Sequence, residues 1–186
     1  MRILSLILVF IASAAMAQDQ AGNDTPGNWV VTHHQPFGLW DSMCDERDED
    51  SGMKRRCYIR YVDVFSPRPE FAALFAFIEP AMPHPTVNIG IERGTVFKHD
   101  GLRIEQDGTP IWTLAHRPCL FGGTCRFEGE AAAPLMEALV TGTHLTFEFI
   151  DPHGAEQIRR WPLGDMPALL ADMSHQAALR NLIPVQ

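Results

Sequence analysis

The sequence predicts an all-β fold, a β-sandwich or barrel-like arrangement of antiparallel strands, with two short amphipathic helices packed on it. Three observations support this prediction. Short apolar or alternating segments recur along the chain, turn-forming residues separate them, and only two segments have helical periodicity. With 186 residues, of which 46% are hydrophobic and 20% charged, the chain is long enough to form one domain with its own core.

The first residues have the features of an export signal. Arg2 precedes an apolar run over residues 3–15, and Ala15-Met16-Ala17 forms a small-x-small cleavage site. A helix of this length spans about 20 Å, which is short of the roughly 30 Å hydrocarbon core of a bilayer. We therefore predict a secretory signal peptide at 1–17, a flexible lead-in at 18–27, and no integral membrane span after cleavage.

The remaining chain, residues 28–182, is predicted to be a single β-rich domain. Apolar residues alternate with polar ones most clearly in residues 58–63 and 145–149. The run 71–78 is apolar on both faces, which predicts a central strand, with a buried helical turn as the alternative. The predicted strands are residues 29–32, 39–44, 56–64, 72–78, 86–92, 95–99, 102–105, 111–114, 124–128, 144–150 and 157–161.

Turns and helices complete the predicted element order. The turns are marked by Asp100-Gly101, Asp107-Gly108, Gly122-Gly123 and residues 151–154. A first helix is predicted over residues 134–140, with a proline at its start and Gly142 as its stop. A second is predicted over residues 165–182, capped by Asp165, with Leu169, Leu170, Met173 and Ala177 on one side.

Four cysteines in an exported chain imply two disulfides, because the compartment outside the cytosol is oxidising. The count permits three pairings. We favour the local one, Cys44 with Cys57 and Cys119 with Cys125, since each pair joins the two arms of a predicted β-hairpin. A zinc site is the competing use, and spacings unlike Cys-x-x-Cys fit it poorly.

The order of motifs resembles the invasion-associated locus B family of exported bacterial proteins, over roughly residues 37–180. The residues that carry this resemblance are Phe37-Gly38-Leu39-Trp40, Cys44 at Trp-x-x-x-Cys spacing, Cys57, Gly101-Leu102-Arg103-Ile104, Asp107-Gly108, Arg117 before Cys119 and Cys125, residues 135–142 and the helix around Leu169. The resemblance implies a compact β-rich periplasmic or secreted domain with two local disulfides and a role in host-cell invasion or the envelope. It implies no catalytic residue and transfers no functional site.

Motifs of known chemistry do not identify a reaction. The sequence has no Gly-x-Ser-x-Gly, phosphate-binding glycine loop, His-Glu-x-x-His or Ser-x-x-Lys motif, and oxidised cysteines cannot act as nucleophiles. We therefore predict a protein without enzymatic activity or cofactor. The alternatives to a binding protein are a periplasmic copper or zinc binding protein and a hydrolase whose site is assembled from distant residues.

Two polar segments are weak metal-site candidates. His33 and His34 could bind copper or zinc, with Met43 and Met53 as soft ligands, but adjacent residues of a strand point to opposite faces. The acidic run 45–50 lacks the alternating spacing of a calcium loop, so we predict a charged hairpin tip compensated by Lys54-Arg55-Arg56, with an acidic contact for a basic partner as the alternative.

The strongest candidate contact site is Leu120-Phe121, inside the short Cys119–Cys125 ring. A small ring cannot enclose its own side chains, so we predict that this pair contacts another protein, with a lid over the core as the alternative. The net charge of −8 argues against nucleic acid as a partner. The sequence therefore predicts a periplasmic or secreted binding protein whose partner is a protein or an envelope component.

Overall fold

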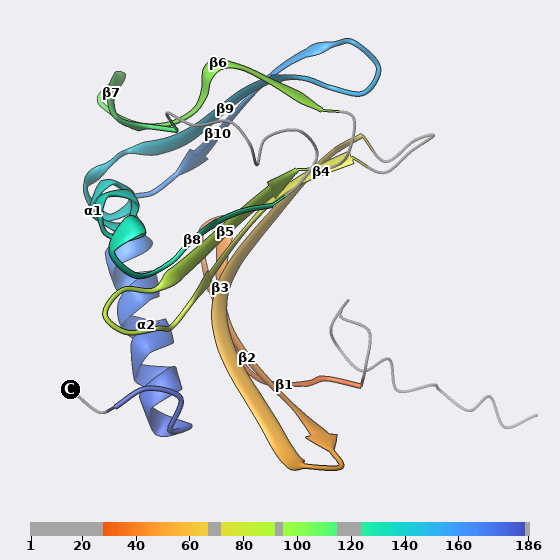
Figure 1. Cartoon of the computed structure of the whole chain (residues 1–186), viewed down its shortest axis with the longest axis vertical. Coiled ribbons are helices and arrows are strands. Elements are labelled where there is room, and N and C mark those ends of the chain that lie inside the picture. The colour runs from red at the N-terminus through yellow and green to blue at the C-terminus, as the bar shows by residue number, and fades with distance from the viewer. Residues whose placement is uncertain (1–27, 67–71, 92–94, 115–123, 185–186) are drawn as a thin grey trace, which may run out of the picture.

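The computed structural model describes residues 28–66, 72–91, 95–114 and 124–184 (Figure 1). These residues form two antiparallel sheets and two α-helices, so the prediction of a mostly antiparallel β fold with two helices is confirmed. The six-stranded sheet has the order β1 (Val30–Phe37), β2 (Trp40–Glu49), β3 (Gly52–Ser66), β4 (Ala72–Glu79), β5 (Thr86–Ile91) and β8 (Thr124–Phe127). The four-stranded sheet has the order β10 (Glu156–Pro162), β9 (His144–Ile150), β6 (Val96–Gln106) and β7 (Thr109–Thr113).

The long strands β2 and β3 connect the parts of the fold. The four-stranded sheet lies over one end of the six-stranded sheet, and α2 (Met166–Leu179) runs beside the other end (Figure 1). Contacts of α2 with both β2 and β3 agree with this placement. The short 3₁₀ helix η1 (Gly129–Ala131) and α1 (Ala133–Thr141) connect the two sheets in the chain. No helix among the described residues is long and apolar enough to cross a membrane.

The core is centred on an aromatic cluster between the two sheets. The ring of Trp161 on β10 lies 5.7 Å from that of Trp40, 4.6 Å from that of Tyr61 and 4.4 Å from that of Phe147, measured between centroids. Both indole N–H groups are satisfied, because Trp40 donates to the carbonyl of Pro162 (2.9 Å) and Trp161 donates to the carboxylate of Asp63 (3.1 Å). Large aromatic surfaces and two specific hydrogen bonds therefore join the sheets.

The two helices are formed close to the predicted positions. Each has a proline in its first turn, where the missing N–H costs nothing. In α2, Leu169, Met173 and Ala177 are buried along one face, as the sequence predicts, and Met166 is buried with them. The fourth predicted member of this stripe, Leu170, is only partly buried. Asp165 occupies the N-cap position of α2 but makes no side-chain capping bond, so the predicted role of this residue as a cap is wrong. Packing of the apolar face stabilises the helix instead.

Gly142 ends α1 for a reason other than a left-handed backbone. Its φ is −74°, which any residue can adopt. A Cβ at this position would lie 2.4 Å from Cγ2 of Ile104 and 2.8 Å from the carbonyl oxygen of Ala138. The close approach of the helix end to β6 therefore requires glycine here.

The predicted turn at Asp100-Gly101 is wrong. Residues 95–99 and 102–105 belong mostly to one strand, β6, which pairs with β9 on both sides of a register shift between Phe97 and Leu102. Asp100 has a positive φ of 55°, and a Cβ on Gly101 would lie 2.2 Å from a backbone oxygen of Glu148. The Asp-Gly pair thus forms a bulge in a continuous strand, because pairing with β9 holds both halves in the same sheet.

Asp151 organises the turn between β9 and β10, as the residues of this turn predict. Its Oδ1 accepts hydrogen bonds from the N–H groups of Ala155 and His153, both 2.9 Å, and its Oδ2 accepts one from the side chain of Gln157 at 3.0 Å. These bonds, that from Ala155 above all, lower the pKa of Asp151. The ionised carboxylate is therefore favoured by the folded state.

We expect the Asp151 turn to contribute to the acid sensitivity of the fold. Folding lowers the pKa of Asp151, so the ionised carboxylate stabilises the folded state. This stabilisation is fully present above the ordinary aspartate pKa of about 4 and is lost as the pH falls through the lower pKa of the folded state. Asp151→Asn should be less stable than the wild type at pH 7, and the two should converge in acid. Urea midpoints between pH 7 and pH 2 measure this, with exposed Asp48→Asn as the control. Parallel loss of stability in the wild type and Asp151→Asn would contradict it.

Candidate functional site

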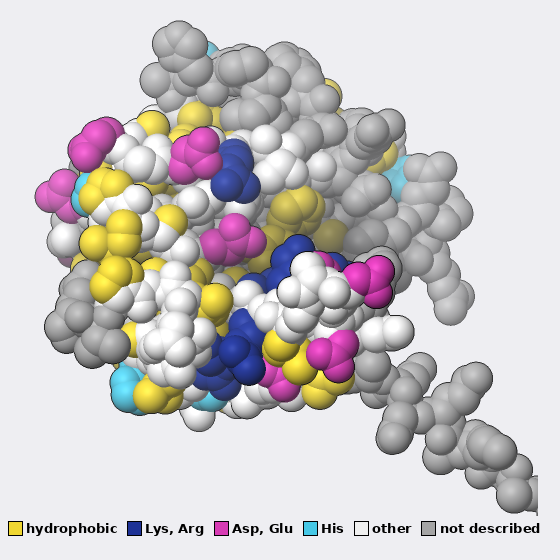
Figure 2. Space-filling model, turned by 60° about the horizontal axis from the view of Figure 1, so that its bottom comes forward, with side chains coloured by type: hydrophobic (Ala, Val, Ile, Leu, Met, Phe, Trp, Pro, Cys, Tyr) yellow, Lys and Arg dark blue, Asp and Glu magenta, His cyan; other side chains and the backbone are white. Residues whose placement is uncertain are grey.

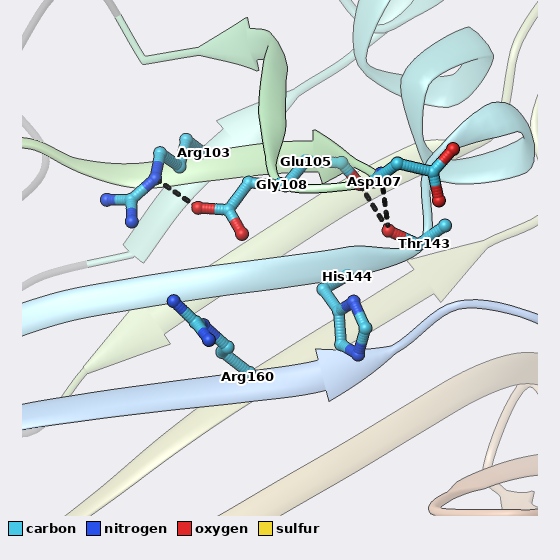
Figure 3. A pocket seen from close by; sticks show the side chains of 7 residues that line it. All are labelled: Arg103, Glu105, Asp107, Gly108, Thr143, His144 and Arg160. Carbon is cyan, nitrogen blue, oxygen red and sulfur yellow. Dashed lines mark hydrogen bonds and ion pairs between the residues drawn. The ribbon is translucent and has the colours of Figure 1, made fainter.

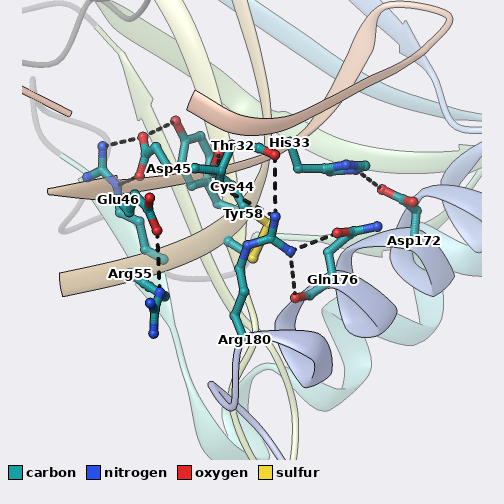
Figure 4. The surroundings of a disulfide bond; sticks show 12 residues. Thr32, His33, Cys44, Asp45, Glu46, Arg55, Tyr58, Asp172, Gln176 and Arg180 are labelled. Carbon is teal, nitrogen blue, oxygen red and sulfur yellow. Dashed lines mark hydrogen bonds and ion pairs between the residues drawn. A yellow bond between two sulfur atoms is a disulfide. The ribbon is translucent and has the colours of Figure 1, made fainter. Parts of the chain in front are cut away.

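The first predicted disulfide is confirmed. Cys44 of β2 and Cys57 of β3 lie directly opposite each other, with their Cα atoms 4.1 Å apart, and are bonded (Figure 4). Their exposed fractions are 0% and 2%, because Ala177 of α2 together with Leu182 and Ile183 packs over them. These sulfurs are sealed from solvent, so this disulfide fastens the structure and does not present a reactive group.

Only one cysteine of the second predicted disulfide belongs to the described residues, and the predicted contact pair does not belong to them. Cys125 on β8 is buried and disulfide-bonded. Its predicted partner Cys119, and Leu120 and Phe121, lie outside the described residues. The Cys119–Cys125 pairing and the protein-contact role of Leu120 and Phe121 therefore stay predictions, as do the signal peptide at 1–17 and the lead-in at 18–27.

His33 connects the edge strand β1 to α2. Its Nε2 lies 2.8 Å from Oδ2 of Asp172 on α2 (Figure 4). Close by, the guanidinium of Arg180 donates to the side-chain oxygen of Gln176 at 2.7 Å and makes a longer contact of 3.4 Å with the carbonyl of Thr32. These polar contacts hold α2 over the disulfide, which gives His33 a structural partner in the fold.

His34 lies on the opposite face of the same strand. It is placed opposite Met43 in the β1–β2 register, whereas His33 is placed opposite Cys44, and its Nε2 lies 2.8 Å from Oδ1 of Asp41. The two histidines therefore cannot bind one metal ion together. Met53 is at the far, exposed end of the β2–β3 hairpin. Within residues 28–66, 72–91, 95–114 and 124–184, no three His, Cys, Asp or Glu side chains are grouped to hold a metal.

The acidic run 45–50 divides into a buried part and a hairpin tip. The prediction of a compensated tip is confirmed by ion pairs from Glu46 to Arg55 (3.4 Å) and from Glu49 to Lys54 (3.6 Å) and Arg47. In the space-filling view, acidic and basic side chains are interspersed on the face that carries this hairpin (Figure 2). Such exposed pairs contribute little to stability, and the mixture of signs leaves no large single-sign surface on this face.

Asp45 does not belong to the tip. It is fully buried, and its carboxylate accepts two hydrogen bonds from the guanidinium of Arg56 (2.6 and 2.9 Å) and one from the hydroxyl of Tyr58 (3.0 Å). Arg56 in turn stacks 3.9 Å from the ring of Trp29. Burial above all, and then Asp45, raise the pKa of Tyr58 to about 12. The sequence prediction missed this cluster because the cross-strand register, rather than the charge pattern, decides which carboxylate is covered.

A polar pocket lies on the four-stranded sheet (Figure 3). Its volume is about 570 Å³, within the range of ligand pockets. Strands β6, β9 and β10, the turn after β6 and the residue before β9 supply the lining, which consists of Arg103, Glu105, Asp107, Gly108, Thr143, His144 and Arg160. The strand register explains this assembly, because Arg103 lies opposite Thr146 and Thr146 lies opposite Arg160 across the three strands.

One side of the pocket is an internally satisfied ion network. The guanidinium of Arg103 donates to Glu105 at 2.6 Å, to Glu148 at 2.7 Å and to the carbonyl of Asp100 at 3.2 Å. The hydrogen bond from Arg103 is the main cause that lowers the pKa of Glu148. Because both carboxylates use the same guanidinium, Arg103 has little capacity left for a ligand.

The turn beside this network is also fixed. Asp107 and Gly108 have positive φ values of 51° and 84°, which confirms the predicted Asp-Gly hairpin turn. The hydroxyl of Thr143 accepts the backbone N–H of Asp107 at 3.3 Å and lies 3.0 Å from the carbonyl of Glu105. These bonds hold the backbone of Asp107 at the pocket edge and leave its exposed carboxylate without an ion pair among the described residues.

Thr146 is the residue between the two arginines in the register. Its Oγ1 is buried and has no hydrogen-bond partner among the described residues. Burying a hydroxyl without a partner costs about 1–3 kcal/mol in proteins.

The remaining polar groups of the lining are a hydroxyl, an imidazole and a second guanidinium. Its hydroxyl, on Thr143, is engaged with backbone groups, and no base within hydrogen-bonding distance activates it in the described part of the chain. Arg160 and His144 are exposed on the other side and make no hydrogen bond or ion pair among the described residues. The sequence prediction did not identify this site, although alternation in β9 and β10 could have placed these polar residues on one face.

Comparisons with known proteins give a likeness in structure but none in sequence. The sequence matches no protein-family model and no curated protein. The structure is similar to the crystal structure of invasion associated protein B from Bartonella henselae, with 15% sequence identity, a TM-score of 0.47, and coverage of 78% of this chain and 97% of that one.

Proposed function

We propose that this protein is an exported, disulfide-stabilised binding module without enzymatic activity, which acts in the periplasm or outside the cell on another protein or an envelope component. The observation that carries this proposal is the sealed Cys44–Cys57 bond under α2. Structural disulfides persist in oxidising compartments and are rare where thiols are kept reduced. The predicted signal peptide at 1–17 supports the same location.

Export and oxidation can be tested together. We expect the full chain, expressed in a bacterium with its first residues intact, to appear outside the cytosol with a start near Gln18. Its intact mass should be four hydrogens below that of the reduced mature chain, because two disulfides form. Cell fractionation and mass spectrometry measure both. Four free thiols, or a retained segment 1–17 in a cytosolic product, would overturn the proposal.

Binding is tested with the contact pair that the sequence predicts. The exported protein should capture a component of envelope extract, and the double variant Leu120→Ser with Phe121→Ser should lose that capture at an unchanged melting temperature. Val62→Ser with Val64→Ser, on exposed positions of β3, is a control of similar apolar loss. Equal capture by the wild type and the contact variant would reject Leu120 and Phe121 as the contact. A large drop in the melting temperature would place them in the core.

A further inference from the structure

Strand β10 ends the four-stranded sheet, and no strand among the described residues pairs with its outer edge (Figure 1). Hydrogen bonds at the two ends of the β9–β10 pair show which backbone groups face this edge. The N–H of Asp151 donates to the carbonyl of Ala155 at 2.9 Å, and the N–H of Leu163 donates to the carbonyl of Thr143 at 3.0 Å. Both pairs continue the register of β9 with β10, in which bonded and non-bonded pairs alternate.

This alternation leaves one set of β10 backbone groups unused by β9. The N–H and carbonyl groups of Glu156, Ile158 and Arg160 are at the non-bonded positions and point away from β9. The carbonyl of Pro162 has the same phase and accepts the indole N–H of Trp40 at 2.9 Å. Since proline has no N–H and this carbonyl is already used, the open edge ends at Arg160. β10 thus presents a short, regular backbone template.

The other edges of the two sheets are less suited to pairing. β1 has a register shift between Val31 and His33, and its Pro36 offers no N–H. β7 contains Pro110, and β8 has only four residues. Such features protect an edge strand from pairing with another chain. β10, in contrast, is in continuous register with β9 and contains no proline before its last residue.

The side chains of β10 are complementary to those of a second, antiparallel β10. Glu156, Ile158 and Arg160 are exposed on one face of the strand, and Ile158 is 59% exposed. A twofold axis at Ile158 places Glu156 opposite Arg160 at both ends and the two Ile158 side chains opposite each other. On the other face, Gln157 lies opposite Arg159, and these two side chains already form a hydrogen bond of 3.2 Å within one chain.

The two charged residues also have neighbours of opposite charge within their own sheet. Glu156 forms an exposed ion pair with Lys98 at 2.8 Å. The pKa of Glu148 is lowered by Arg103 above all and, more weakly, by Arg160. Exposed ion pairs contribute little to affinity by themselves, whereas like charges directly opposite each other are unfavourable. The charges of β10 therefore mainly select the register of a strand pair.

We propose that this protein self-associates through β10, which pairs with β10 of a second copy across a twofold axis at Ile158 and joins the two four-stranded sheets into one. Each bonded pair exchanges two backbone hydrogen bonds, so three pairs give about six. Registers centred on Glu156 or Arg160 would place like charges opposite each other. A strand pair of this length buries less than the roughly 1,200 Å² of a stable complex, so we expect half-association at about 100 µM.

This inference goes beyond the proposed function, because pairing of β10 needs neither an envelope component nor Leu120 and Phe121. Failure of envelope capture leaves the β10 pair intact. A monomeric protein that still captures an envelope component leaves the proposed binding function intact and removes the β10 pair. The two outcomes are therefore distinguishable.

The first test measures mass by sedimentation equilibrium on the exported, purified protein. We expect a monomer at about 1 µM and a mass approaching that of the dimer at about 1 mM. Ile158→Lys, which places two ammonium groups at the centre of the pair, should weaken association at least about ten-fold. Val140→Lys, at an exposed position of α1, is the matched control. A monomer at 1 mM, or unchanged association of Ile158→Lys, would overturn the proposal.

Charge reversal tests the register. Glu156→Arg and Arg160→Glu should each weaken association at least about ten-fold, because each places like charges opposite each other at both ends of the pair. An equimolar mixture of the two variants should associate again, since every guanidinium then faces a carboxylate. Arg126→Glu and Glu128→Arg, at an exposed ion pair beside β8, are the matched controls and should associate like the wild type. Single variants that associate normally, or a mixture that stays monomeric, would reject this register.

Amide hydrogen exchange reports the proposed hydrogen bonds directly. The N–H groups of Glu156, Ile158 and Arg160 should exchange more slowly at about 1 mM protein than at about 10 µM, because only the dimer bonds them. Those of Gln157 and Arg159 bond to β9 in the monomer and should change little. Nuclear magnetic resonance resolves the five amides. Equal exchange of Ile158 at both concentrations would show that β10 is not the paired strand.

Discussion

Trp161→Ala should lower the free energy of unfolding by about 3–5 kcal/mol, the cost of removing a large buried aromatic side chain. Trp161 is 1% exposed and contacts rings from both sheets, so its loss leaves a cavity at the point where the two sheets meet. The carboxylate of Asp63 also loses the indole N–H that it accepts. Urea unfolding, followed by circular dichroism, measures the change.

Two further variants separate cavity from hydrogen bond. Trp161→Phe keeps an aromatic ring but removes the N–H donor to Asp63, so it should cost less than the alanine variant, about 1–3 kcal/mol. Ile158→Ala, on the same strand but 59% exposed, should change stability by no more than about 0.5 kcal/mol. If Trp161→Ala proved as mild as Ile158→Ala, β10 would not form the contact between the sheets described above.

Removal of the Cys44–Cys57 bond should have an effect of similar size. Replacement of both cysteines by alanine is expected to cost about 3 kcal/mol, because a loop of this length gains conformational freedom in the unfolded chain. The urea midpoint of the double variant should fall accordingly. Met53→Ala, at the exposed end of the same hairpin, is the control and should leave the midpoint nearly unchanged.

Burial of the sulfurs adds a second, kinetic expectation. A mild reductant should leave Cys44–Cys57 intact in the folded protein and reduce it in urea, since α2 and residues 182–183 cover both sulfurs. Thiol alkylation followed by peptide mass spectrometry distinguishes the two states. Rapid reduction under native conditions would show that α2 leaves the disulfide accessible, contrary to the packing of Ala177.

The sequence predicts best those elements whose local pattern agrees with their final environment. The strand at 144–150 coincides with β9, and that at 72–78 is within one residue of β4, because apolar runs and alternation there reflect burial directly. The predicted disulfide between Cys44 and Cys57 is correct for a similar reason, since two cysteines on opposite arms of one hairpin meet at fixed register.

The remaining features depend on partners that are distant in the sequence. β1 continues through Pro36 to Phe37, because an edge strand tolerates a missing N–H, whereas the sequence predicts its end at Thr32. β2 and β3 extend beyond the predicted strands, since acidic residues of one arm pair with basic residues of the other. The pocket escapes prediction because Arg103 and Arg160 are brought together only by their common neighbour β9.

The position of α2 in the chain has a consequence for biogenesis under the proposed export. Cys44 and Cys57 belong to the second and third strands, whereas the residues that cover them come much later in the chain. During export, an oxidant outside the cytosol can therefore reach both cysteines of the β2–β3 hairpin before α2 has crossed. The disulfide is covered only when α2 and residues 182–183 pack over it. A chain truncated before α2 should accordingly carry a bond that any external thiol can exchange.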